Sequence, residues 1–196
     1  SMGAFVVARL AAAHPARVRA VALVDGGLVL SVPTDVDPDK VLEMVLGPAL
    51  ARLRMTFESR DAYRDFWRAH PAFSGPGMWG ADVEDYVDYD LAGDPGQLRS
   101  RVSEAAVRAD GADLLDVAAV RRAFLALACP TVLVRAPRGL LDDPNPLLPE
   151  DAVAEAKAAL PHLVDVAVAD TNHYQILLGD REAKTVADQI RALCGL

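Results

Sequence analysis

Residues 1–24 read SMGAFVVARLAAAHPARVRAVALV, and this stretch decides the fold. The small tripeptide Ser1-Met2-Gly3 leads into an alanine-rich apolar run at 4–13, and His14-Pro15 separates that run from a Val-rich segment at 17–24. Apolar residues fall on nearly every side of a helix drawn over 4–13, so we expect it to be buried almost all round. A helix followed after a tight turn by a β-branched run is half of a β-α-β unit, which predicts a parallel sheet.

The composition narrows the classes of protein that the chain can belong to. Its 196 residues, 52% hydrophobic and 24% charged, can hold one globular domain or a modest domain with an insertion. The net charge of -8 argues against a nucleic-acid partner, because phosphate binding needs a clustered basic surface. No apolar window is long enough for a membrane span and residues 1–13 lack a basic leader, so a cytoplasmic location is the default expectation. Cys129 and Cys194 form no metal-binding pattern, and we expect no metal, cofactor or disulfide.

The middle of the chain has a different character from its two ends. Between 28 and 127, helical periodicity appears at 41–54, 60–69, 83–89 and 97–110, separated by Gly and Pro breakers. We expect 28–127 to form a helical lid inserted between two core segments, 1–27 and 128–196. The alternative is a second, all-α domain with its own core. Four aromatic side chains in this region can line an apolar substrate pocket beneath the lid or simply form the lid's own core: Trp67, Trp79, Tyr86 and Tyr89.

Strand character returns after the lid. The segment 130–134 reads P-T-V-L-V, a Pro-rich loop leads to a helix at 150–160, and a second short strand follows at 164–169. The tail continues with D-T-N-H-Y at 170–174 and helices at 175–178 and 181–193.

In this order of elements the chain resembles the α/β-hydrolase superfamily, in particular its lidded serine hydrolases. Ser1-Met2-Gly3 resembles the second half of their G-x-S-x-G elbow, and Asn172-His173 falls where they carry the catalytic histidine. The resemblance implies Ser1 as nucleophile, His173 as general base and the Met2 N–H as an oxyanion donor. It also implies an acyl-serine reaction on an ester, lactone, thioester or amide of a small apolar substrate. Relatives that use an aspartate nucleophile are excluded by the serine.

The third member of the catalytic set is open between two carboxylates. The family commonly places its acid as G-x-x-D after the strand equivalent to 131–134, but the matching residue here is Gly139. Asp142 can substitute if the loop carries an insertion, and Asp25 can substitute from the end of the earlier strand. We prefer Asp25, because some lidded relatives, including one haloalkane dehalogenase group, place their acid there. The plain alternatives are a turn-capping Asp25 and a solvated Asp142.

Three further alternatives follow from the same residues. Ser1-Met2 can be a scar of tag removal, and an amino-terminal serine also invites comparison with hydrolases that use their own terminal amine as base. The altered loop at 136–142 allows a hydrolase-fold protein that binds a small ligand without chemistry. Because the elbow helix has no strand before it here, we expect the amino-terminal portion of the same hydrolase as a companion segment.

Overall fold

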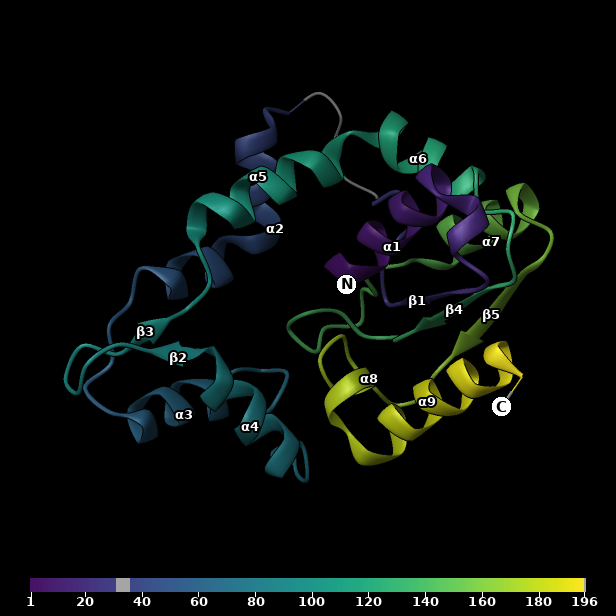
Figure 1. The fold of residues 1–196 in the computed structure, drawn as a ribbon. Helices are drawn as coiled ribbons and strands as arrows, with labels where there is room; N and C mark the ends of the chain where they lie inside the picture. Colours follow the sequence, from purple (N-terminus) through teal and green to yellow (C-terminus); the bar gives the residue numbers. More distant parts are fainter. Residues whose placement is uncertain (31–35, 196) are drawn as a thin grey trace. The chain divides into compact units, whose positions relative to one another are not determined.

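The computed structural model describes residues 1–30 and 36–195, and Figure 1 shows its fold. The chain divides into two compact units. The first comprises Ser1–Ser31 and Asp116–Leu196, and the second comprises Val32–Leu115.

The first unit is built on a three-stranded parallel sheet. Its strands are β1 (Val21–Val24), β4 (Thr131–Arg135) and β5 (Leu163–Ala167), in the order β1-β4-β5. Every residue of the central strand β4 is buried, as expected for a parallel sheet covered on both faces. Parallel pairing brings the carboxyl ends of all three strands to one edge, where the chain continues into Asp25, Ala136 and Val168.

Helices cover both faces of this sheet (Figure 1). One face packs against α1 (Met2–Ala13), α6 (Val117–Leu125) and α7 (Glu150–Ala159), around a core that includes Leu23, Leu133 and Leu163. The other face packs against α8 (Gln175–Leu178) and α9 (Asp180–Cys194), around Val132, Val134, Ile176 and Val186. Neighbouring strand residues alternate between the two cores because successive side chains of a strand point to opposite faces. A short 3-10 helix, Pro15–Arg17, joins α1 to β1.

Helix α1 differs from the prediction that it is buried all round. Ala4, Ala8 and Ala11 face the core, but Val6 and Leu10 are 56% and 49% exposed. The prediction was wrong because spacings of three and four residues place only one stripe of a helix against the sheet. The apolar residues outside that stripe lie at the surface.

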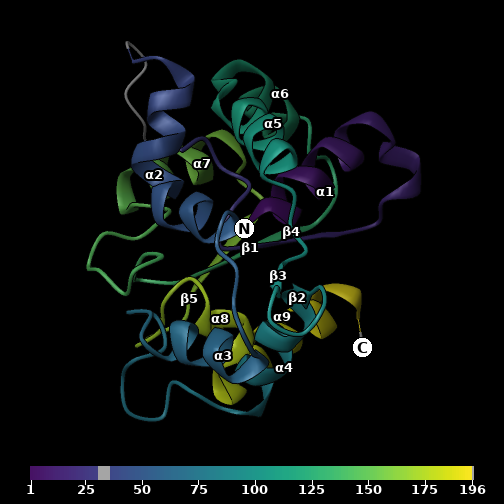
Figure 2. The same cartoon turned by 90° about the vertical axis from the view of Figure 1, so that its left-hand side faces the viewer.

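The second unit is mostly helical, with one feature that the sequence did not predict. Its helices are α2 (Pro38–Leu53), α3 (Arg60–Arg68), α4 (Ala81–Asp90) and α5 (Glu104–Leu115). The expected helix at 97–110 begins only at Glu104, because β3 (Arg99–Ser100) pairs antiparallel with β2 (Leu91–Ala92). Gly93 and Gly96 turn the chain between these strands at positive φ, 117° and 86°. Figure 2 shows this unit from the side, with α3 beside α4.

An aromatic cluster forms the core of the second unit. Tyr63, Trp67 and Phe73 are buried, and the Trp67 ring lies 5.7 Å from Phe73 and 6.3 Å from Tyr86, in edge-to-face contacts. Tyr89, by contrast, is 80% exposed. Trp67 therefore packs in the core of the second unit, which agrees with a core role for this side chain.

The second unit, at 32–115, is shorter than the predicted lid at 28–127. Leu28, Phe124 and Leu127 belong to the core of the first unit. The reason is that α6 packs against α1 and thereby returns residues 117–125 to the sheet. The sequence contains no pattern of polar residues that predicts this contact between α6 and α1.

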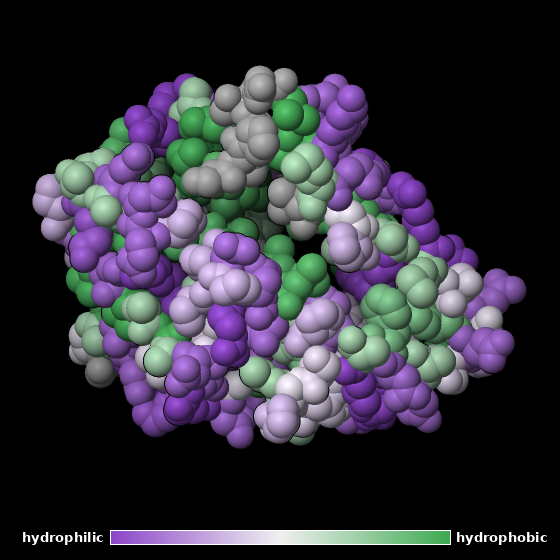
Figure 3. All heavy atoms as spheres, turned by 180° about the vertical axis from the view of Figure 1, so that it is seen from behind, coloured by the Kyte–Doolittle hydropathy of each residue, from purple (hydrophilic) through white to green (hydrophobic). Residues whose placement is uncertain are grey.

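The surface agrees with the chain's charged composition. Figure 3 shows one face on which hydrophilic side chains predominate, with smaller apolar patches between them. Among the described helices, none has the length and continuous apolar character needed to cross a bilayer.

Candidate active site

Asp25 lies at the carboxyl end of β1 and is fully buried. Its N–H donates to the Val134 carbonyl at 2.8 Å, so the sheet pairing extends to this residue. Its φ of 42° is in the left-handed region, which aspartate adopts more readily than most residues. This conformation ends the strand and leaves the carboxylate at the edge of the sheet.

Both oxygens of the Asp25 carboxylate have a partner. Oδ1 accepts the N–H of Ala136 at 3.1 Å, and Oδ2 lies 2.7 Å from Nδ1 of His173. Removing an ionised carboxylate from water is costly unless such partners replace the solvent. The Ala136 N–H was not predicted as part of the site, because a backbone donor leaves no mark in the sequence.

The end of β4 is anchored so that this backbone donor is held in place. The Arg135 guanidinium, which is buried, binds Asp165 at 2.8 Å and Glu150 at 2.7 Å. The hydrogen bond with Asp165 raises the pKa of Arg135, so the guanidinium is positively charged at any working pH. Ala136 follows directly and is buried.

His173 lies on the segment between β5 and α8, and it is 9% exposed. Because the carboxylate of Asp25 is an acceptor, the nitrogen that faces it, Nδ1, carries the proton when the ring is neutral. The second ring nitrogen, Nε2, is then the basic one. A buried aspartate that fixes the tautomer of a histidine in this way prepares the ring to accept a proton.

Ser1 lies against both residues that flank Asp25. Its nitrogen donates to the Val24 carbonyl. A Cβ added to Gly26 would lie only 2.7 Å from the Ser1 carbonyl oxygen and 3.0 Å from Ser1 Cα, so this close approach requires glycine. Ser1 is exposed, and its side chain makes no capping bond to α1.

Met2 begins α1, so its N–H is among the donors that lack a partner within the helix. The Ser1 carbonyl accepts the N–H of Ala4 at 2.9 Å, which starts the first helical turn. Within the described residues, Ser1 forms no hydrogen bond with His173. Catalytic hydrogen bonds often tighten only when substrate is bound.

Among the described residues, no hydrogen bond or ion pair joins Asp142, the other candidate carboxylate, to His173. Asp142 Oδ1 accepts from Nε of Arg138 at 2.7 Å and from Nδ2 of Asn172 at 3.0 Å. Gly139, at the position where the family commonly carries its acid, has no room for a side chain. A Cβ added there would lie 2.6 Å from both the Asn145 carbonyl oxygen and a carboxylate oxygen of Asp143. Of the two carboxylates weighed from the sequence, Asp25 is thus the one that meets the histidine.

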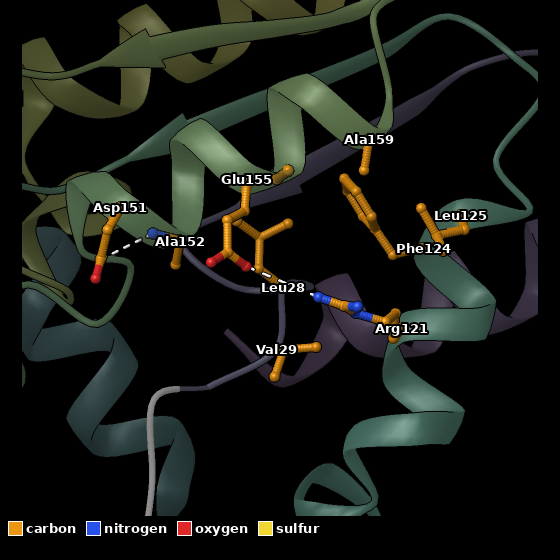
Figure 4. Close-up of a pocket in the computed structure, with 10 residues that line it drawn as sticks. Leu28, Val29, Arg121, Phe124, Leu125, Asp151, Ala152, Glu155 and Ala159 are labelled. Atoms are coloured by element: carbon orange, nitrogen blue, oxygen red, sulfur yellow. Dashed lines mark hydrogen bonds and ion pairs between the residues drawn. The ribbon is translucent and has the colours of Figure 1, made fainter.

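A cavity of about 220 Å³ lies elsewhere in the first unit, between α6 and α7 (Figure 4). Its lining includes Leu28, Phe124 and Ala156, and the Arg121–Glu155 ion pair, at 3.7 Å, crosses it. Neither Asp25 nor His173 lines this cavity. Within the described part of the chain, no group of three or more His, Cys, Asp or Glu side chains is placed to hold a metal ion.

Comparison with solved structures defines the class of fold. The structure of E-2-(acetamidomethylene)succinate hydrolase matches with a TM-score of 0.70 and 20% identity, covering 100% of this chain and 65% of that protein. A thioesterase domain from the curacin biosynthetic pathway matches with a TM-score of 0.63 and 13% identity, covering 96% of this chain and 63% of that one. A peroxisomal alpha-beta-hydrolase from Saccharomyces cerevisiae matches with a TM-score of 0.66 and 10% identity, covering 97% and 52%.

The chain therefore has the α/β-hydrolase fold, which is the fold that the resemblance in the sequence implied. It spans less than two thirds of the length of these solved structures. No model of a known protein family matches the chain, and no curated protein matches it significantly.

Proposed function

We propose that this chain carries the nucleophile, base and acid of a serine hydrolase. In this reaction His173 Nε2 takes the proton of the Ser1 hydroxyl while the oxygen attacks the carbonyl carbon of the substrate. The bond to the leaving group then breaks, and the histidine returns the proton to it. Water next attacks the acyl-serine with the same histidine as base, which releases the acid and restores Ser1.

The observation that carries the proposal is the buried Asp25–His173 pair beside Ser1. The two side chains are 148 residues apart in sequence, yet they meet at 2.7 Å with the carboxylate fully buried. Val24 and Gly26, the residues on either side of Asp25 in the chain, contact the Ser1 backbone. A buried carboxylate, an oriented imidazole and an exposed hydroxyl at one sheet edge are the groups that acyl transfer to serine requires.

The start of α1 supplies a further element that the reaction needs. The oxyanion that forms on the attacked carbonyl requires preorganised donors, and the Met2 N–H follows the nucleophile directly. The positive end of the helix dipole adds to its effect. Loss of one such donor typically lowers kcat by about 100- to 1,000-fold.

For the substrate we propose an ester, lactone, thioester or amide of a small apolar molecule. The similar structures include a thioesterase domain and an esterase from a marine microorganism, as well as a hydrolase named for an acetamidomethylene succinate. These names support acyl transfer on this fold, and they leave the leaving group open.

Labelling by a fluorophosphonate probe tests the proposal. Such a probe phosphonylates an activated serine, so we expect labelling at Ser1 and its loss in Ser1→Ala and His173→Ala. Ser74→Ala and His162→Ala are the matched controls, because Ser74 and His162 are exposed side chains outside the site. Absence of labelling in well-folded protein would contradict the proposal.

A hydrolase-fold binding protein without chemistry is the alternative, and the closed acid position at Gly139 favours it. The two functions differ in their dependence on His173. Turnover of an activated ester should vanish in His173→Ala if the protein is an enzyme. Binding of a small apolar ligand should survive the same substitution if it is a receptor.

A further inference from the structure

The side chain of Asn172 holds the backbone on the far side of His173. Asn172 is fully buried and directly precedes the histidine. Its Oδ1 accepts the N–H groups of Tyr174 at 3.0 Å and Gln175 at 2.9 Å. These bonds span His173, so the rotamer of Asn172 fixes the path of the chain that carries the imidazole.

Asp142 binds the other end of the Asn172 amide. Its Oδ1 accepts from Asn172 Nδ2 at 3.0 Å, and because a carboxylate only accepts, it selects the amide nitrogen. The amide oxygen is thereby directed to the N–H groups beyond the histidine. Without the Asp142 side chain, the Asn172 amide would be held only at its oxygen end, by the Tyr174 and Gln175 N–H groups.

Arg138 completes the arrangement. Its Nε donates to the same Asp142 oxygen at 2.7 Å, and NH2 donates to the Asp170 carbonyl at 3.3 Å. The arginine therefore links the turn after β4 to the start of the histidine loop. Asp142 and Asp170 both have positive φ, 58° and 56°, a conformation that such surrounding bonds maintain.

We propose that Asp142, with Arg138 and Asn172, is a positioning unit that holds His173 in register with Asp25. This inference rests on the proposed hydrolase function, because it assigns His173 a task that needs accurate placement. Among the described residues, Asp142 forms no hydrogen bond or ion pair with His173 or Ser1, and it acts through its two partners, Asn172 and Arg138. The carboxylate after β4 thus supports the histidine loop, while the carboxylate after β1 orients the ring.

Two readouts test this unit, and only one of them depends on catalysis. The first is the NMR resonance of the His173 Nδ1 proton, assigned by its loss in His173→Gln, which reports the hydrogen bond to Asp25. The second is the rate of fluorophosphonate labelling. In Asp142→Ala we expect the resonance to broaden or shift and labelling to slow by about 10- to 100-fold, since misplacement by about 1 Å has effects of this size.

Asp143→Asn is the matched control, because Asp143 is adjacent and its amide replacement can still accept the Asn145 N–H. The milder variant Arg138→Gln should shift the His173 Nδ1 proton resonance in the same direction. It replaces Asp142→Ala as the test if that variant does not fold. An unchanged resonance in both Asp142→Ala and Arg138→Gln would overturn the proposal. A resonance that changes as expected, with no labelling even of the unmodified protein, would support the positioning unit and count against the hydrolase function instead.

Discussion

Replacing Asp25 with asparagine separates the orientation of His173 from the packing of the site. Asparagine has the same shape, so its Oδ1 can still accept the Ala136 N–H that now lies 3.1 Å from the carboxylate. Its Nδ2, however, is a donor and faces His173 Nδ1, which must then become the acceptor. The imidazole proton moves to Nε2, and the ring can no longer take a proton from Ser1.

We expect this change of tautomer to lower kcat by roughly 10,000-fold, the size of effect known for such a replacement in a catalytic triad. That factor corresponds to about 5.5 kcal/mol of transition-state stabilisation. The free energy of unfolding should change much less, because both hydrogen bonds of the buried side chain keep a partner. In Asp25→Ala the Ala136 N–H and His173 Nδ1 lose their common partner, at a cost of about 1–3 kcal/mol for each buried group.

The assay is hydrolysis of a p-nitrophenyl ester, with urea unfolding as the measure of stability. Asp110→Asn, an exposed carboxylate on α5, is the control. If Asp25→Asn keeps nearly full activity while Asp142→Asn loses it, the assignment of the acid is wrong. Equal losses of activity and stability would also refute the reasoning, because a change of tautomer does not unfold the protein.

Three more results are expected. Gly26→Ala places its Cβ 2.7 Å from the Ser1 carbonyl oxygen, so it should destabilise the protein by about 1–3 kcal/mol and slow fluorophosphonate labelling. In the control Gly47→Ala the new Cβ meets nothing within 4 Å, and neither effect is expected. Burial, together with Arg52, lowers the pKa of His70. The neutral His70 therefore contributes to the free energy of unfolding above about pH 6.5, and this contribution is lost as the pH falls below that value. In urea unfolding, His70→Asn should lose less stability than the wild type between about pH 7.5 and about pH 5.5. Hydrogen bonds from arginines lower the pKa of Glu104 to about 2. Its stabilising effect is therefore present above the ordinary pKa of a glutamate and fades as the pH falls toward 2. In Glu104→Gln, the Tm from thermal denaturation should depend less on pH over that range.

Each of these results has an outcome that contradicts it. Wild-type labelling rates in Gly26→Ala would mean that Ser1 can move away from Gly26 without consequence. Parallel pH curves for wild type and His70→Asn would show that His70 does not cause the pH dependence. Parallel curves for wild type and Glu104→Gln as the pH falls from the ordinary pKa of a glutamate toward 2 would show the same for Glu104.

Patterns that are local in sequence allowed much of the fold to be predicted. The Val-rich strands and the helices at α2, α3, α4, α7 and α9 were found within a few residues of their bounds. The predicted helix at 97–110 failed at its start, because the β2–β3 pairing supplies hydrogen bonds that no local pattern shows. The exposed stripe of α1 was missed for a similar reason, since alanine and valine look alike on either face of a helix.

The sequence by itself determined the order of elements, the presence of Ser1 before an apolar helix, and a histidine after the last strand. Side-chain periodicity and turn chemistry are properties of neighbouring residues, so they can be read directly along the chain. Only the tertiary structure decided that Asp25, and not Asp142, meets His173, and that Asn172 joins Asp142 to the histidine loop. Parallel strands bring distant carboxyl ends to one edge, and the direction in which each chain leaves that edge depends on backbone angles and contacts that a linear sequence does not display.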